Sequence, residues 1–172
     1  GTFESPAMTD LEAYQFDLAG HLHIRAMLSA DQAAALHEAC IALEADALAC
    51  REHAPHWTAI WNDMDYWQSE AHGYFAFGER AEGKTLMVED FWLWPDVFDA
   101  LIGHERTMQY INRIVPQPAV INNSELRIRY RDNQSRMHMG LPRSRMAKYR
   151  YEVVDGQIVC NMVRMVYFVQ DV

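Results

Sequence analysis

The stretch from residue 149 to residue 169 reads YRYEVVDGQIVCNMVRMVYFV and decides the fold of the last third of the chain. Two runs rich in β-branched and aromatic residues flank the dipeptide Asp155-Gly156, which suits the positive φ angles of a tight hairpin turn. The sequence therefore predicts antiparallel strands over residues 149–154 and 157–169. The later part of the second run, Val163 to Val169, predicts a central strand that is covered on both faces.

Upstream of the hairpin, Leu126 to Tyr130 alternates apolar and basic residues, which predicts another strand with one buried face. Helices are predicted earlier in the chain. A capping-box pattern starts a helix that runs from Ala30 to about Glu52. A second helical stretch extends from Pro95 to Ile114 and could break at Gly103. Helices followed by an antiparallel sheet predict an α+β fold.

Two other regions in the first half of the chain have weaker patterns of secondary structure. Leu22 to Arg25 alternates and predicts a short strand. The segment from Trp57 to Trp94 is rich in aromatic residues but shows few periodic signals, so it is expected to be irregular. No internal repeat and no Gly/Ser/Pro-rich linker divides the chain. Residues 1–172 are therefore predicted to form a single domain.

Composition and charge limit the classes of partner. The net charge is −9, which argues against nucleic acid as the main partner because phosphate backbones attract basic surfaces. No apolar run is long enough for a membrane span, and no secretory signal is visible at the first residues. The 3 cysteines include no CxxC pair, which does not suit a disulfide framework. These features predict a cytoplasmic protein.

Common catalytic motifs are missing from the sequence. It contains no Gly-rich phosphate loop, no Gly-x-Ser-x-Gly elbow and no HExxH helix. One histidine stands out by its position: His138, in QSRMHMG (134–140), lies between the alternating strand and the hairpin. From its residue pattern alone it is a turn histidine. The basic residues of the last third favour either a solvated strand face or contact with a small anionic ligand.

Several segments taken together resemble the phytanoyl-CoA dioxygenase-like family. FDLAGHLHI (16–24), followed by Leu28-Ser29 and a helix, is similar to the family's N-terminal pattern. The segment 100–115 is similar to the helices that precede the family's β-barrel. VRMVYFVQDV (163–172) resembles its core strand, and His138 falls where the family places the first histidine of its iron site. The resemblance covers the first two-thirds of such a protein.

The resemblance implies a double-stranded β-helix of the jelly-roll type and an oxygenase that uses Fe(II) and 2-oxoglutarate to hydroxylate a small organic substrate. The family's iron is held by His-x-Asp/Glu and a distal His, which leaves open positions for 2-oxoglutarate and oxygen. His138 is the only one of these metal ligands in the chain. Asn161 and Arg164 are the implied contacts to the cosubstrate, on the strand that follows the hairpin.

The sequence departs from the family pattern at the carboxylate position, which is Gly140. One explanation is a divergent or lost site. The other is a halogenase-like oxygenase, in which a small residue at this position lets a halide bind the iron. The distal His would lie beyond Val172, so Fe(II) and 2-oxoglutarate are not expected to bind this chain firmly. Whether the chain is an enzyme therefore stays open.

About four visible strands are too few to close a barrel, so the chain is expected to be a truncated, inactive piece of the fold. The alternative is a non-catalytic protein that binds a partner or associates with itself. An open sheet edge would favour a homo-oligomer, because pairing two edges covers both of them.

Overall fold

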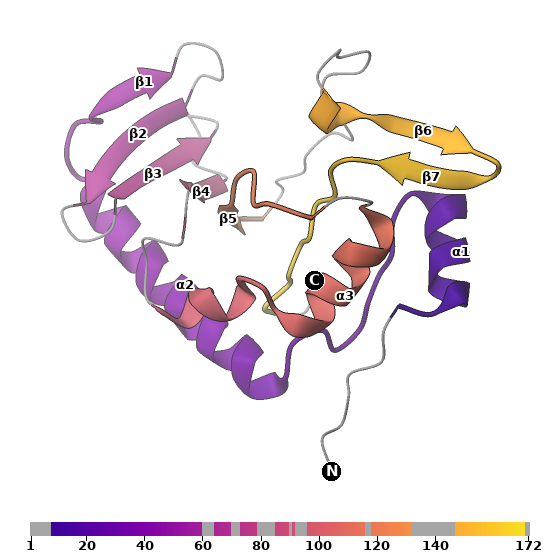
Figure 1. Cartoon of the computed structure of the whole chain (residues 1–172). Helices are drawn as coiled ribbons and strands as arrows, with labels where there is room; N and C mark the ends of the chain where they lie inside the picture. Colours follow the sequence, from indigo (N-terminus) through magenta and orange to yellow (C-terminus); the bar gives the residue numbers. More distant parts are fainter. Residues whose placement is uncertain are drawn as a thin grey trace. The chain divides into compact units, whose positions relative to one another are not determined.

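A computed structural model describes residues 8–59, 64–69, 73–78, 85–89, 91, 96–115, 118–131 and 147–170 (Figure 1). The chain is a mixture of helices and antiparallel strands, as predicted. Its contacts divide it into two compact units, each built from separate stretches of the sequence. The first unit comprises residues 1–30, 101–120 and 137–168, and the second comprises 31–100, 121–136 and 169–172.

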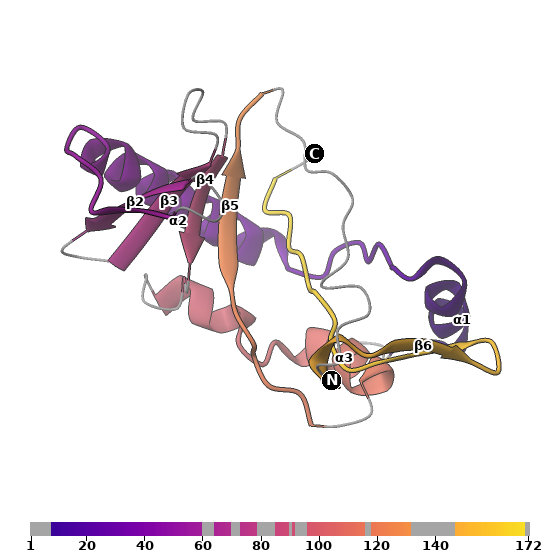
Figure 2. The ribbon, with the colours of Figure 1, turned by 90° about the horizontal axis from the view of Figure 1, so that it is seen from above.

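A five-stranded antiparallel sheet forms the second unit. Its strands are β1 (Trp57–Ala59), β2 (Met64–Ser69), β3 (Gly73–Gly78), β4 (Thr85–Glu89) and β5 (Glu125–Arg129). Neighbours in the sheet follow the order β1-β2-β3-β4-β5, which Figure 2 shows from β2 onward. The predicted strand at Leu126 to Tyr130 is confirmed as β5, and it pairs with β4 although a long connection separates them.

One face of this sheet is covered by α2 (Ala30–Cys50), whose bounds agree closely with the predicted helix. The register aligns alternate apolar side chains of β3 and β4 on this face, and these are among the largest fully buried side chains: Phe75, Phe77, Leu86 and Val88. The Arg51 guanidinium, just after α2, lies 4.7 Å from the centre of the Phe77 ring. The Ser69 hydroxyl of β2 donates to Asp46 of α2 at 3.1 Å. Helix and sheet thus share one apolar layer.

The prediction that Trp57 to Trp94 is irregular was wrong, because most of its described residues form β1 to β4. Both faces of the sheet are covered in this region. On the face opposite α2, Tyr66, Ala76 and Met87 form a second buried cluster. A strand buried on both faces loses the apolar–polar alternation on which the prediction depended, and consecutive residues such as Tyr66 and Trp67 are both apolar.

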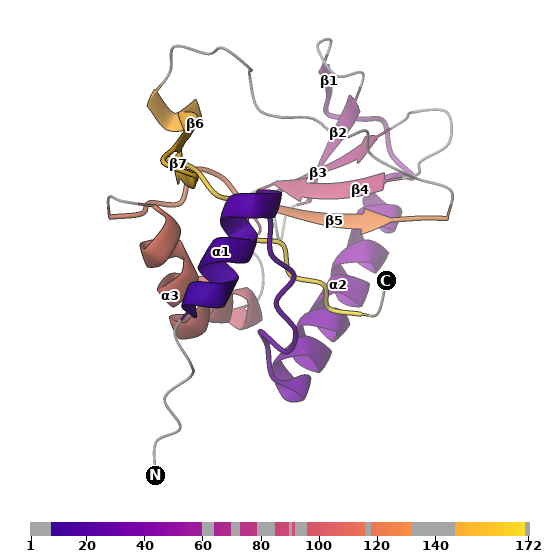
Figure 3. The same cartoon turned by 90° about the vertical axis from the view of Figure 1, so that its right-hand side faces the viewer.

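The first unit contains two helices side by side, α1 (Asp10–Ala19) and α3 (Glu105–Ile114) (Figure 3). The Tyr110 hydroxyl of α3 donates to Glu12 of α1 at 2.7 Å. Arg113 and Asp10 form an exposed ion pair at 3.2 Å. A hydrogen bond and an ion pair therefore link these two helices.

Two separate helical segments form within the predicted helical stretch from Pro95 to Ile114. The 3-10 helix η2 (Asp96–Leu101) ends two residues before Gly103, which adopts a left-handed conformation with φ of 65°. α3 begins two residues later. The predicted break at Gly103 is confirmed. Another 3-10 turn, η3 (Ala147–Tyr149), precedes the hairpin in the first unit.

The hairpin itself is confirmed. β6 (Tyr151–Val154) and β7 (Gln157–Cys160) pair antiparallel. Asp155 and Gly156 have φ angles of 52° and 79°, the left-handed values that a two-residue hairpin turn of type I′ requires. The backbone N–H of Ile158 donates to the Asp17 carboxylate of α1 at 2.7 Å, which fixes the hairpin to the helix.

Two strand predictions in the first unit were wrong. No strand forms at Leu22 to Arg25; the helix α1 precedes this segment, and Arg106 donates to the Ala26 carbonyl at 2.7 Å just after it. The strand predicted to reach Val169 ends at Cys160. Residues 162–168 are outside any strand, and Val166 and Phe168 are each 61% exposed, so this segment is not covered on both faces.

A matched pair of substitutions in α2 tests the shared apolar layer. Leu43 is 2% exposed and Leu48 is 44% exposed, so the same change in the same helix removes packing at one position and little at the other. We expect Leu43→Ala to lower the free energy of unfolding by about 2–5 kcal/mol and Leu48→Ala by less than about 1 kcal/mol.

The measurement is urea denaturation followed by tryptophan fluorescence, because all 5 tryptophans belong to the second unit's range of the sequence. Equal losses for the two variants would contradict the packing of α2 on the sheet.

Candidate functional site

The three residues predicted from the family resemblance are placed unequally. His138 lies outside the described residues. Asn161 follows β7 in the first unit, where its side-chain amide donates to the Ala147 carbonyl at 2.8 Å and its backbone N–H donates to the Arg150 carbonyl at 3.2 Å. Asn161 therefore holds the η3 turn against the end of the hairpin.

Arg164 does not share a face with Asn161. From residue 161 to residue 170 the side chains alternate between half-buried and exposed, with Asn161 half-buried and Arg164 exposed. In an extended chain, residues separated by an odd number point to opposite sides. The structure therefore does not bring the two predicted cosubstrate contacts together.

A polar network lies on the half-buried side of the same segment. The Thr107 hydroxyl shares a hydrogen bond with the Tyr167 hydroxyl and lies 3.0 Å from Nδ1 of His104, the residue that caps α3. Thr107 is buried, and burial raises the pKa of Tyr167. The Tyr167 phenol is therefore neutral at physiological pH, and the network anchors residues 162–168 to α3.

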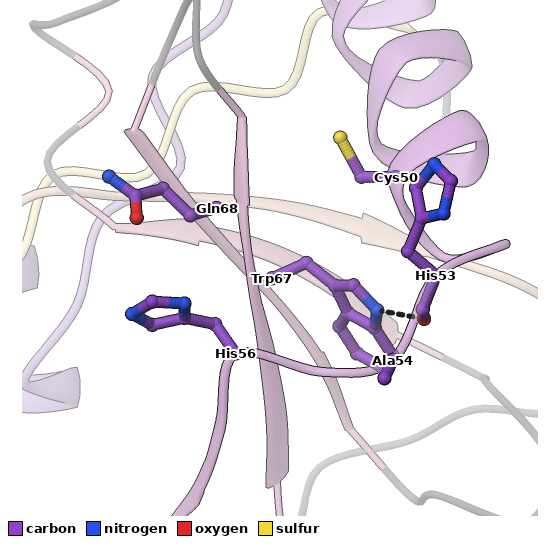
Figure 4. A pocket seen from close by; sticks show the side chains of 6 residues that line it. All are labelled: Cys50, His53, Ala54, His56, Trp67 and Gln68. Atoms are coloured by element: carbon purple, nitrogen blue, oxygen red, sulfur yellow. Dashed lines mark hydrogen bonds between the residues drawn. The ribbon is translucent and has the colours of Figure 1, made fainter.

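One cavity among the described residues is in the second unit (Figure 4). Its volume is about 330 Å³, and it lies where the end of α2 meets strand β2. Its lining residues are Cys50, His53, Ala54, His56, Trp67 and Gln68. Figure 4 shows Cys50 and His53 on one side of the Trp67 indole and His56 and Gln68 on the other. The indole N–H donates to the His53 carbonyl at 2.9 Å, which fixes the loop after α2 against the strand.

A cluster of aromatic rings on the neighbouring strands contacts His56, one of the residues that line this cavity. Trp57 stacks on Tyr66 with ring centres 4.7 Å apart and planes inclined by 8°. Tyr74 meets Trp57 edge-on, also at 4.7 Å, and the His56 ring lies 5.7 Å from that of Trp57. Trp57 and Tyr74 are both exposed, and the cluster lies next to the cavity without lining it.

The Cys50 thiol of this cavity is not activated as a nucleophile. Burial, and after it the Asp46 carboxylate, raises the pKa of Cys50, so the thiol is protonated and a poor nucleophile at neutral pH. Within the described ranges, no group of three His, Cys, Asp or Glu side chains could hold a metal ion. The imidazoles and the Gln68 amide can still donate and accept hydrogen bonds.

A second cavity, of about 320 Å³, lies in the first unit between α1, α3 and the start of β7. Asp17 and Arg113 supply its charges. Asp17 accepts the Ile158 N–H, and Arg113 is paired with Asp10. Both charged groups are therefore engaged in holding the unit together.

The first cavity was not predicted from the sequence. Cys50, His53 and His56 recur every third residue just before the aromatic strands, and this spacing is the signal for it. The signal is weak because the residues follow the end of α2, where no regular periodicity fixes which side chains converge.

Comparison of the chain with protein-family models, curated proteins and solved structures finds no match. None of the helices in the described ranges is long and apolar enough to cross a membrane.

The protonation state of Cys50 can be tested directly. In a Cys40→Ser, Cys160→Ala background, Cys50 is the only thiol. We expect its alkylation by iodoacetamide to rise with pH through a midpoint above that of an ordinary thiol, because burial and Asp46 disfavour the thiolate. Asp46→Asn removes the nearby charge and should move the midpoint to lower pH, so the rate at pH about 8 should rise severalfold.

The measurement is the rate of mass increase by intact-protein mass spectrometry across a pH series. A midpoint that Asp46→Asn leaves in place would show that the carboxylate does not act on the thiol.

Proposed function

We propose that this chain is related to the phytanoyl-CoA dioxygenase-like oxygenases, which use Fe(II) and 2-oxoglutarate to hydroxylate small organic substrates. The observation that carries the proposal is the ordered series of sequence matches, from FDLAGHLHI (16–24) through His138 to VRMVYFVQDV (163–172). The order of elements is compatible with it, since helices and β5 precede the hairpin. The finer fold proposed is an incomplete double-stranded β-helix.

The metal ligands of that family fit this chain poorly. The position two residues after His138 is Gly140, which has no side chain to bind iron. The described residues offer no alternative set of three ligands. A single imidazole cannot hold Fe(II) against water and competing metals, because the family's centre depends on three ligands on one face of the ion. We therefore propose little or no turnover by the chain as it stands.

Arg164 is the more suitable of the two proposed cosubstrate contacts. Its side chain is exposed, whereas the Asn161 amide already donates to Ala147. A guanidinium can bind a carboxylate through two parallel hydrogen bonds, which is the chemistry that 2-oxoglutarate requires. Because the two side chains lie on opposite faces, one small ligand would contact only one of them.

The test is an anaerobic titration of the purified chain with Fe(II) and 2-oxoglutarate, observed through the visible charge-transfer band of the iron chelate. We expect no band above that of the free components. His138→Ala is the matched variant, because it removes the one ligand of the motif that the chain contains.

A band that appears in the native chain and disappears in His138→Ala would overturn the proposed inactivity and support the family assignment. Strengthening of that band by chloride or bromide would favour the halogenase-like alternative at Gly140. A band that His138→Ala leaves unchanged would place the iron elsewhere and count against the family assignment.

A further inference from the structure

Strand β6 has a free edge that is chemically complementary to itself. Within the described residues it pairs with β7 alone. All four of its residues are exposed, including Tyr151 at 48%, Val153 at 62% and Val154 at 46%. An isolated two-stranded hairpin is marginally stable in water, and exposed apolar strand edges attract further strands.

The turn determines which backbone groups lie along this edge. In a hairpin with a two-residue loop, the residues that flank the loop exchange both hydrogen bonds, and here these are Val154 and Gln157. Alternate residues of β6 then point their N–H and C=O groups outward. The free edge therefore presents the backbone groups of Tyr151 and Val153.

The hairpin is held firmly enough to present this edge. Ile158 of β7 is buried and bonded through its N–H to Asp17 of α1. At the other end of the strands, a Cβ built on Gly20 would lie 3.6 Å from the Tyr151 hydroxyl, so the end of α1 lies against β6. Helix α1 therefore supports the hairpin, and among the described residues no strand pairs with the outer edge of β6.

Charges on the edge select the register of a partner strand. Arg150 and Glu152 flank Tyr151 and lie on one face, where they form an exposed ion pair at 2.8 Å. In antiparallel pairing, residues opposite one another must both point their backbone groups toward the partner. A second copy of β6 can therefore place Tyr151 opposite its own Tyr151 or opposite Val153, or place Val153 opposite Val153.

Only the first of these registers matches the charges. With Tyr151 opposite Tyr151, Arg150 of each copy lies opposite Glu152 of the other, which gives two attractive pairs. With Tyr151 opposite Val153, the two Glu152 side chains face each other and repel. With Val153 opposite Val153, Glu152 lies against Val154 and no charge pair forms.

We propose that β6 is a self-association edge, on which the occupant is β6 of a second copy of this chain, antiparallel and centred on Tyr151. The two hairpins then form a four-stranded sheet across a two-fold axis, with the same surface used by both copies. This proposal does not depend on the oxygenase assignment. The exposed apolar side chains of residues 162–168 are the competing surface, and they have no comparable charge pattern.

Charge reversal provides the experiment. Arg150→Glu gives two acidic residues on each edge, and Glu152→Arg gives two basic residues. We expect sedimentation velocity of the full chain, at concentrations up to about 1 mM because so small an interface binds weakly, to show a concentration-dependent dimer. Each single reversal should weaken it at least about tenfold, because two attractive pairs become repulsive.

Restoring complementarity should restore the dimer. The double variant Arg150→Glu/Glu152→Arg should self-associate like the native chain. An equimolar mixture of the two single variants should form a heterodimer although neither dimerises alone. Circular dichroism of each variant confirms that the hairpin still folds.

A native chain that stays monomeric throughout the concentration range would overturn the proposal. So would a dimer that survives both single reversals. If Val166→Lys abolished that surviving dimer, the contact would belong to residues 162–168 instead of β6.

Discussion

The second unit depends on one apolar layer between α2 and the five-stranded sheet. Leu43 on the helix and Phe75 and Leu86 on the sheet are all buried. Each such side chain contributes about 1.5–3 kcal/mol by leaving water, more than a typical hydrogen bond between neutral groups. Because this layer fixes the axis of α2, it also determines where the helix ends. The loop that follows can then meet β2 at Trp67, and the cavity beside it exists because these two elements converge there.

The first unit is held together differently. Helix α1 has no buried residue, and its hydrogen bonds and ion pair to α3 and β7 are made by Asp10, Glu12 and Asp17. The pKa of Glu12 is lowered, first by the backbone N–H of Thr9 and then by the Tyr110 hydroxyl. An ionised Glu12 therefore stabilises the unit at neutral pH, and this contribution is lost as the pH falls through its folded pKa. Polar contacts of this kind contribute less than an apolar layer, so α1 should detach from its unit more readily than α2 from the sheet.

Local chemistry made parts of the fold predictable from sequence. Asp155-Gly156 can satisfy two consecutive positive φ angles, so the hairpin followed directly. Helix α1 was not predicted although Thr9 and Glu12 form a complete capping box, because the helix buries no residue and so has no marked apolar face. The strands β2 and β3 were missed for a different reason. A pattern read from one chain cannot show that both faces of a sheet will be covered, and two-sided burial removes the periodicity.

The candidate site also has features that follow from residue spacing and features that depend on the packing of distant segments. That Asn161 and Arg164 lie on opposite faces follows from their odd separation in an extended segment, and this could have been predicted. The convergence of Cys50, His56 and Trp67 could not be predicted, since it requires the packed position of α2 against β2.

A strand edge depends less than a catalytic site does on side chains from distant segments. An active site needs several groups from distant segments, whereas a strand edge needs one strand with a suitable sequence. Here β6 and the preceding Arg150 supply the apolar residues and both charges within five consecutive positions, 150–154. Local sequence is therefore a better guide to assembly through this strand than to catalysis.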